Sequence, residues 1–283
     1  MQRKPSSTTS APGIATALPS SILPKLHLFE FNDSAWFPET FRNAITEVLR
    51  ALCLRLRVHE VIRPVIERVL DDSAAERIVD LCSGATGPII PLQQQLADSG
   101  CRIPVLLTDR FPNRAAYQWA EQATGGAVLG CMNPVDATQV PAGMTGLRTL
   151  FNAFHHFKPV AARAILADAY CSRQPIAIFE ITERGPVRTF SNFILSFLTM
   201  LILLPRMRAR RPEWWLFTYL LPVLPLAFGW DGFVSCLRSY TASEFAQLKE
   251  GLEDQSYSWS SGRMPVPGSP IHINYFLGMP HRS

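Results

Sequence analysis

The six cysteines of this 283-residue chain form no CxxC pair, and the histidines stand at spacings unlike those of zinc-binding motifs. We therefore expect no metal site, because structural zinc needs paired ligands at short, regular intervals. Most of the cysteines lie in apolar runs, where cysteine behaves as a small hydrophobic residue. This cysteine usage favours a reducing, cytoplasmic setting.

Charged side chains are also scarce, at 18% of residues against 47% hydrophobic ones, and the formal net charge is +4. This composition suits one large domain with a substantial core and does not suit disorder over most of the chain. The only dense basic cluster lies at 206 to 211. A nucleic-acid site would need a stronger basic face interleaved with aromatics, so we expect no nucleic-acid partner.

The first 25 residues lack acidic side chains and any unbroken apolar segment, so they do not predict a secretory signal. They are rich in Ser, Thr, Pro and Ala, which favours a disordered tail over 1–25 followed by one domain over 26–283. A transit peptide is the alternative for this segment.

Apolar residues recur at helical spacing after Pro38 and predict helices over 39–72, with Pro64 breaking or restarting the run. Strand-like apolar runs then alternate with helical segments along the chain. The predicted strands lie at 77–82, 102–109, 125–132, 146–154 and 175–181, and two more lie within 255–277. This alternation predicts an α/β fold with a mainly parallel sheet, in which ligands bind at the carboxyl ends of the strands.

The first predicted strand runs into "DLCSGATGP", residues 80 to 88, and a helix follows. Such a turn presents backbone N–H groups to a ligand beside a helix N-terminus. The G-x-G-x-x-G pattern of dinucleotide-binding folds is absent. The alternative is an ordinary strand-to-helix turn with no ligand.

This turn resembles the first motif of class I S-adenosylmethionine-dependent methyltransferases, which reads roughly acidic-x-G-x-G-x-G. Asp80, Cys82, Gly84 and Thr86 occupy these four slots, and Gly87 follows one place later. The resemblance implies a Rossmann-like methyltransferase fold: a mainly parallel seven-stranded sheet with helices on both faces and, here, an apolar helical insertion after strand five. It also implies S-adenosyl-L-methionine as cofactor, with the turn beneath its methionine part and Asp80 near its α-ammonium group.

The later strands end on residues that match the same family. Asp109 would accept hydrogen bonds from both ribose hydroxyls, although capping the next helix is an alternative role. Asp136 would face the adenine amino group, and Asn152 would lie near the cofactor. The full cofactor-binding set that the resemblance implies is Asp80, Cys82, Ser83, Gly84, Gly87, Asp109, Arg110, Asp136, Ala137 and Asn152.

The fourth strand ends in "LFNAFHHF", which resembles a paired-histidine segment of many small-molecule methyltransferases. His155 and His156 would then approach the methyl-transfer centre, where a neutral imidazole takes a proton from the acceptor. The alternative is that one histidine packs in the core and the other caps a helix.

Residues 187–234 form an unusual insertion with two apolar, uncharged runs, 190–204 and 214–228. Each run has 15 residues, whereas a membrane span needs about 20. We therefore expect an apolar cap over the active site, which could also contact a membrane surface or form a homodimer. A shallow membrane hairpin is the alternative. The expected walls of the substrate pocket are Trp36, Phe37, Trp230 and Asp231.

The sequence thus predicts an S-adenosylmethionine-dependent methyltransferase that acts on a small, partly apolar molecule. Two alternatives stay open. In one, the cofactor is itself the substrate and cyclises to azetidine-2-carboxylate and methylthioadenosine. In the other, the chain is a non-catalytic, membrane-associated binding protein.

Overall fold

The computed structural model describes residues 23–34, 36–207 and 211–281. All but the last three residues of the predicted tail, and the middle of the arginine cluster, lie outside the described residues.

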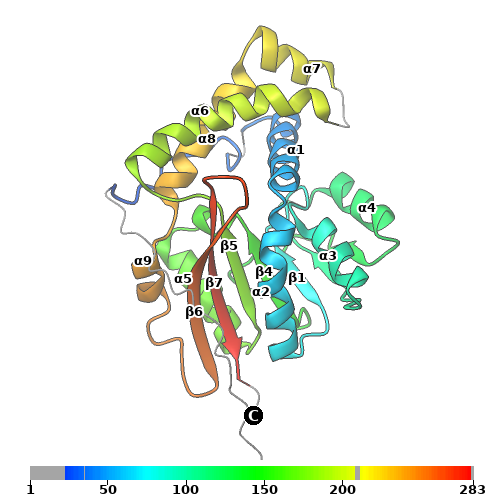
Figure 1. The fold of residues 1–283 in the computed structure, drawn as a ribbon, viewed down its shortest axis with the longest axis vertical. Coiled ribbons are helices and arrows are strands. Elements are labelled where there is room, and N and C mark those ends of the chain that lie inside the picture. Colours follow the sequence, from blue (N-terminus) through cyan, green and yellow to red (C-terminus); the bar gives the residue numbers. More distant parts are fainter. Residues whose placement is uncertain (1–22, 35, 208–210, 282–283) are drawn as a thin grey trace, which may run out of the picture.

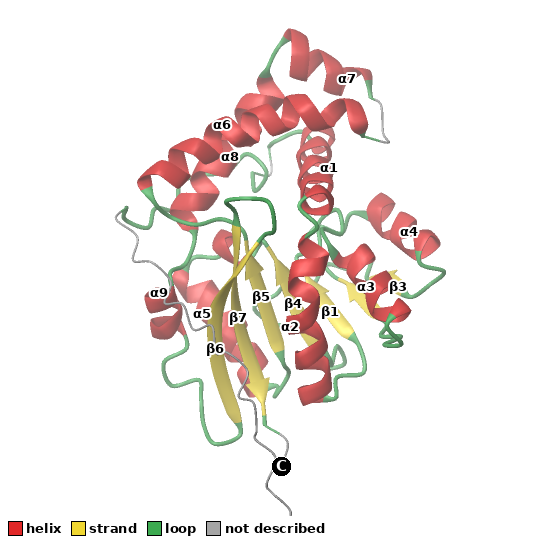
Figure 2. Cartoon of the chain, in the orientation of Figure 1, coloured by secondary structure: helices red, strands yellow, loops and turns green. Residues whose placement is uncertain are grey.

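A single seven-stranded sheet has the order β3-β2-β1-β4-β5-β7-β6. The first five strands are parallel, and β7 is antiparallel to both β5 and β6. The strands are β1 Ile78–Leu81, β2 Val105–Leu107, β3 Val128–Gly130, β4 Leu147–Phe151, β5 Ile176–Glu180, β6 Tyr257–Pro265 and β7 His272–Pro280. This order, with helices on both faces (Figure 2), confirms the predicted Rossmann-like methyltransferase fold.

Alternate residues of the central strands serve two separate cores. In β5, Ala177 and Phe179 belong to one core, while Ile176 and Ile178 belong to the other. Because successive strand side chains point to opposite faces, both faces of this sheet need apolar cover. The first core is covered by α2 Val58–Ser73, α3 Ile89–Asp98 and α4 Arg114–Ala123, the second by α5 Pro159–Cys171 and α9 Ala242–Leu248.

Pro64 neither breaks nor restarts a helix, contrary to the expectation, and lies inside α2. The break falls earlier, at Arg57, whose left-handed φ of 50° separates α2 from α1 Glu39–Arg55. Pro64 is exposed, so water can reach the carbonyl that its missing N–H leaves unbonded. The apolar face of α2, with Ile62, Val65 and Ile66, packs into the first core and holds the helix together.

The insertion after β5 forms what we call the arm, residues 186–238. It consists of α6 Pro186–Leu203, η2 Leu204–Arg206, α7 Pro212–Trp215, η3 Leu216–Leu220 and α8 Val223–Arg238. Figure 1 shows α6 and α8 crossing the molecule beyond the carboxyl ends of β4 and β5, with α7 at the tip. A third core joins α1 to the arm through residues such as Val48, Met200 and Trp214.

The helix that contains the first apolar run is longer than the run itself. Residues 186 to 206 form one helix of 21 residues, which by length and composition could cross a membrane. The apolar run has the 15 residues that the sequence shows, but the helix also includes 186–189 before the run and Pro205 and Arg206 after it. The second run bends by 76° between Leu220 and Val223, where Pro222 interrupts it.

Candidate active site

The turn after β1 adopts the backbone that glycine prefers, even where glycine is missing. Cys82 and Thr86, the two departures from the family pattern, have φ of 57° and 77°, and Gly84 and Gly87 have φ of 49° and 45°. A left-handed conformation is costly for a non-glycine residue, and most of all for a β-branched one such as Thr86. The fold therefore imposes a glycine-type loop on side chains that oppose it.

Asp80 stands at the start of this turn and is buried. One of its carboxylate oxygens accepts a hydrogen bond from the Thr149 hydroxyl (2.7 Å), and its carbonyl accepts one from the Ser83 hydroxyl (2.8 Å). Burial raises the pKa of Asp80 to about 7, although these hydrogen-bond donors oppose the rise. A cation placed beside this carboxylate would favour its ionised form.

Asp109 follows β2 and binds the turn directly. It accepts hydrogen bonds from the backbone N–H of Gly84 (3.0 Å) and of Phe111 (2.8 Å). The capping role considered for Asp109 belongs instead to Asn113, which accepts from the Ala116 N–H at the start of α4. Burial raises the pKa of Asp109 as well.

The remaining predicted cofactor residues differ in exposure. Asp136 is exposed and accepts hydrogen bonds from the backbone and hydroxyl of Thr138, which lower its pKa. Ala137 is buried in the second core, and Arg110 is exposed beside the Phe111 ring.

Three of these carboxyl groups raise the pKa of one residue of the turn, Cys82. Burial first, and then the charges of Asp109, Asp80 and Asp136, hold the pKa of the Cys82 thiol well above its usual range. Among the described residues, none of these three acids is in an ion pair. The carboxyl ends of β1, β2 and β3 therefore place three carboxyl groups near the turn, and none of them contacts a cationic side chain of the described residues.

Asn152 connects the ends of β4 and β5. Its backbone N–H donates to Phe179 (2.7 Å), and its side-chain oxygen accepts from the Ile181 N–H (3.2 Å). Asn152 has φ of 51°, a conformation that asparagine tolerates better than most residues. This turn leads into the short helix η1 Phe154–His156, which carries both histidines.

His155 is buried against Glu180, the last residue of β5. Its Nδ1 lies 2.5 Å from the Glu180 carboxylate, which also accepts from the Phe154 N–H (2.7 Å). Although burial opposes ionisation, His155 and the Phe154 amide lower the pKa of Glu180. An ionised carboxylate only accepts hydrogen bonds, so Nδ1 carries the proton.

The other ring nitrogen of His155 has no hydrogen-bond partner among the residues that the structure describes. Nε2 is buried together with the rest of His155, which is only 1% exposed. A proton on Nε2 would be a buried donor without an acceptor, which is costly. Nε2 therefore presents a lone pair, and Glu180 fixes the orientation of the ring.

His156 has a different environment. Its Nδ1 lies 3.0 Å from Asp33 and 3.3 Å from Glu30. Burial works against the charged form, but these two carboxylates outweigh it and raise the pKa of His156 to about 9. His156 is thus an imidazolium at neutral pH and cannot accept a proton there. The structure separates the two histidines that the sequence treated alike.

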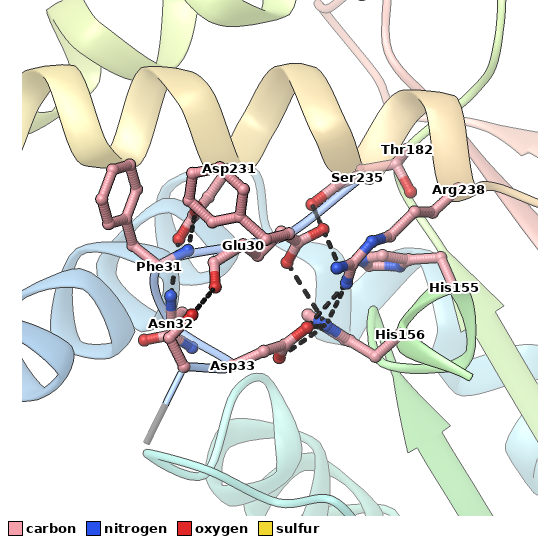
Figure 3. Close-up of polar contacts among 12 residues, drawn as sticks. Glu30, Phe31, Asn32, Asp33, His155, His156, Thr182, Asp231, Ser235 and Arg238 are labelled. Atoms are coloured by element: carbon pink, nitrogen blue, oxygen red, sulfur yellow. Dashed lines mark hydrogen bonds and ion pairs between the residues drawn. The ribbon is translucent and has the colours of Figure 1, made fainter. Parts of the chain in front are cut away.

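Residues 26–34 form what we call the N-terminal strap, which runs along α8. Arg238 donates to the Leu28 carbonyl and to Asp33 (2.6 Å), and it lies 3.2 Å from Glu30. Figure 3 shows Glu30 and Asp33 of the strap directed at His156 and Arg238. The strap therefore closes over the end of β4 through paired charges.

The four predicted substrate residues have separate roles. Asp231 is buried and accepts from the N–H groups of Phe31 (2.7 Å) and Asn32 (3.0 Å), so it anchors the strap. Trp230 donates its indole N–H to the Phe29 carbonyl (3.0 Å). Phe37 packs in the third core, and Trp36 is 69% exposed.

Glu30, His155 and His156 place ligand atoms within 4.8 Å of one another, close enough to hold a metal ion. A divalent ion there would meet the guanidinium of Arg238, which lies 3.2 Å from Glu30 and 3.5 Å from His156 Nδ1. Arg238 already supplies the positive charge that Glu30 needs. The cluster thus fits an internal ion-pair network better than a metal site.

Sequence reasoning missed Glu180, Glu30, Asp33 and Arg238. Glu180 carried a usable signal, because an acid inside the apolar strand "IAIFEI" must find a partner when buried. Glu30 and Arg238 are 208 positions apart, and only the path of the strap along α8 brings them together.

No protein-family model matches the chain, and no curated protein matches it. Solved structures with a similar fold include the plantazolicin methyltransferase BpumL in complex with SAH, which is 10% identical (TM-score 0.49, 86% of this chain and 87% of that one). An O-methyltransferase from neocarzinostatin biosynthesis, NcsB1, in complex with S-adenosylmethionine and a naphthoic acid is 12% identical (TM-score 0.42, 76% and 56%).

A Nostoc punctiforme protein described as an O-methyltransferase is 13% identical (TM-score 0.43, 76% of this chain and 55% of that one). The chain thus spans little more than half the length of several of these proteins. At such identities the likeness concerns the fold alone. The function proposed below therefore depends on the residues of this chain.

Proposed function

We propose that this protein is an S-adenosylmethionine-dependent methyltransferase that acts on a small, partly apolar molecule bearing a protic acceptor group. The observation that carries the proposal is the meeting of two arrangements at one sheet edge. A turn with Asp80 and Gly84 follows β1, and His155, whose Nε2 has no partner among the described residues, follows the neighbouring parallel strand β4.

The carboxylate-rich turn suits a cationic cofactor. S-adenosylmethionine carries a sulfonium and an α-ammonium group, and Asp80, Asp109 and Asp136 supply negative charge without an ion-pair partner. Following the family resemblance, Asp80 would hold the ammonium group and Asp109 the ribose hydroxyls. When bound, the cofactor would supply an electrophilic methyl group. The glycine-type backbone of the turn would let it approach closely.

His155 suits the role of general base. Glu180 fixes the tautomer in which Nε2 has a free lone pair, and burial keeps water away from that nitrogen. An acceptor O–H or N–H directed at Nε2 would lose its proton as its oxygen or nitrogen attacks the methyl group in line. The resulting imidazolium would be stabilised by the Glu180 carboxylate.

The strap and α8 would enclose the acceptor. α8 lies beyond the carboxyl ends of β4 and β5 (Figure 1), and the strap lies between α8 and the two histidines (Figure 3). Their inward groups are largely neutralised in pairs, such as Glu30 with Arg238. An enclosed, internally neutral wall favours a small acceptor with apolar surface and excludes water from the transfer.

Identification of the nucleoside product tests this proposal. Purified protein is incubated with S-adenosylmethionine and fractionated small-molecule extract, and the nucleosides are identified by mass spectrometry. We expect adenosylhomocysteine that depends on the extract and on His155. Methylthioadenosine formed without extract would instead support cyclisation of the cofactor. No turnover despite cofactor binding would favour the non-catalytic alternative.

A further inference from the structure

The arm exposes many large apolar side chains. Thirteen of the 20 large hydrophobic side chains recorded as exposed among the described residues lie between 187 and 226. They are Val187, Phe190, Ile194, Leu195, Leu198, Ile202, Trp215, Leu216, Tyr219, Leu220, Leu221, Val223 and Leu226. Contiguous apolar patches of this kind are uncommon on soluble monomers and mark interaction sites.

On α6 the exposed residues form a single stripe. Phe190, Ile194, Leu198 and Ile202 follow one another at intervals of four, so they share one face of the helix. The buried residues Thr189, Ser196, Met200 and Leu203 lie on the opposite face. Only 28% of the apolar 18-residue stretch of this helix is buried, so α6 is not an internal core helix.

The inner face of α6 is fixed to the domain. The Asn192 side chain donates to the Gly232 carbonyl of α8 (2.6 Å), and a Cβ added to Gly232 would clash with Ser196. α8 in turn holds the strap through Asp231 and Arg238. Crossing a bilayer would break these contacts, whereas lying in its surface preserves them.

The charge of the arm identifies the occupant of this face. The arm contains six arginines, one glutamate and one aspartate, so its net charge of +4 equals that of the whole protein. The remainder of the chain is formally neutral. Arg206 and Arg211 lie on either side of residues 208–210, and the aromatic residues Trp215 and Tyr219 follow them in the sequence.

We propose that the arm docks on the surface of an anionic lipid bilayer. The stripe of α6 would enter the acyl boundary, and the arginines would contact the anionic headgroups. Trp215 and Tyr219 belong to the types that favour the membrane–water interface. A second copy of the chain is a poorer occupant, because a two-fold contact would oppose two segments of like charge and the remaining surface offers no net negative complement.

Vesicle flotation tests this docking and does not depend on methyl transfer. The full-length protein is mixed with vesicles of phosphatidylcholine, with or without phosphatidylglycerol. We expect it to float with the anionic vesicles only and to be released at high salt, because headgroup contacts are screened. Absence of flotation with the anionic vesicles at low salt would overturn the proposal.

Two sets of exposed variants locate the contact. The triple change Phe190→Asn, Ile194→Asn and Ile202→Asn should abolish flotation. The double change Arg206→Gln and Arg211→Gln should weaken vesicle affinity roughly 10- to 30-fold, from the contribution of each arginine near an anionic surface. Val160→Asn is the matched control, because Val160 is 84% exposed on α5, outside the arm, and should bind as wild type.

Sedimentation of the same proteins without lipid distinguishes the second copy. A wild-type dimer that the triple change converts to monomer, without any vesicle binding by the wild type, would assign the face to self-association and reject the lipid. Wild-type protein that stays with the vesicles after salt and alkaline washing would also reject a surface position, since that behaviour belongs to a span. Circular dichroism confirms that each variant is folded.

Discussion

The two halves of the sheet edge treat acidic side chains in opposite ways. Around the turn after β1, Asp80, Asp109 and Asp136 have no ion-pair partner among the described residues. Beyond β4, Glu30 and Asp33 are paired with His156 and Arg238. The first half has carboxyl groups that a cationic ligand can pair with, whereas the acids of the second half already have cationic partners.

The difference indicates a division of labour. Of these three acids Asp80 is buried, and an unpaired buried carboxylate costs free energy that a bound cation can offset. Paired charges do not attract a ligand but hold the strap in place. His155 lies next to His156, is oriented by Glu180, and has one ring nitrogen without a partner among the described residues.

The largest effect is expected at His155. His155→Asn keeps a side-chain N–H where Nδ1 meets Glu180 and removes Nε2. We expect turnover to fall about 10²–10⁴-fold, the usual contribution of a general base, with cofactor affinity nearly unchanged. Steady-state kinetics and calorimetry measure the two quantities.

His156→Asn is the matched control for this change. Its imidazolium is engaged by Asp33 and Glu30, so its loss should alter the strap and the KM for the acceptor more than the turnover number. Equal losses of turnover in both variants would remove the distinction between the two histidines.

Asp109→Ala should weaken cofactor binding roughly 10- to 100-fold while the fold is retained. Each hydrogen bond to a charged acceptor contributes about 1.5–3 kcal/mol, and the ribose would lose at least one. Asp136→Ala should have a smaller effect, because Asp136 is exposed and already bonded to Thr138. Unchanged binding by Asp109→Ala in calorimetry would reject the ribose assignment.

The raised pKa of Asp80 predicts that the stability of the cofactor-free protein depends on pH. Its pKa of about 7 lies above the ordinary 3.8, so the empty folded state holds the proton more tightly than the unfolded chain does. This contribution to stability is present below about pH 4 and is lost as pH rises through 7. Denaturation of the cofactor-free protein and of Asp80→Asn across this range measures it as the difference between the two profiles, because Asp231, whose pKa is also raised to about 7, contributes to both.

Cofactor binding should show the reverse trend. The α-ammonium group favours ionised Asp80, so the affinity for S-adenosylmethionine should rise between pH 6 and 8. The affinity for methylthioadenosine, which lacks the amino-acid group, should stay level. Parallel pH profiles for the two ligands would mean that Asp80 only shapes the turn.

The smallest effect is expected from Thr86→Gly. Glycine would relieve the left-handed φ of 77° but would cost unfolded-state entropy, so we expect stabilisation of at most about 1 kcal/mol. Ala85→Gly is the matched control at a buried neighbour without positive φ, and it should destabilise. Thermal unfolding measures the stability of both variants. A loss of stability in Thr86→Gly would show that the contacts of the Thr86 side chain stabilise the fold by more than the backbone strain costs.

The sequence predicted the sheet and the glycine-type turn after β1 well because both leave local signals. Continuous apolar runs marked the buried strands, and Asp80, Gly84 and Asp109 stood at fixed places after them. The turn has a glycine-type backbone although Cys82 and Thr86 replace glycine. The position of the motif after β1 therefore predicted the backbone better than the identity of each residue did.

The strap and the true length of α6 could not be predicted in the same way. Glu30 and Arg238 meet only after the whole domain has folded, and no periodicity links positions so far apart. α6 extends beyond its apolar run because polar residues such as Thr189 find buried places against the domain. Helix ends and long-range ion pairs therefore depend on tertiary packing.

A crystal structure with S-adenosylmethionine bound tests the central claim most directly. We predict that Asp109 contacts the ribose, that Asp80 lies beside the ammonium group, and that the sulfonium methyl faces His155 Nε2. Between the methyl and Nε2 there should be room for an acceptor atom about 3 Å from each. A cofactor bound elsewhere, or a methyl group directed away from Nε2, would contradict the account.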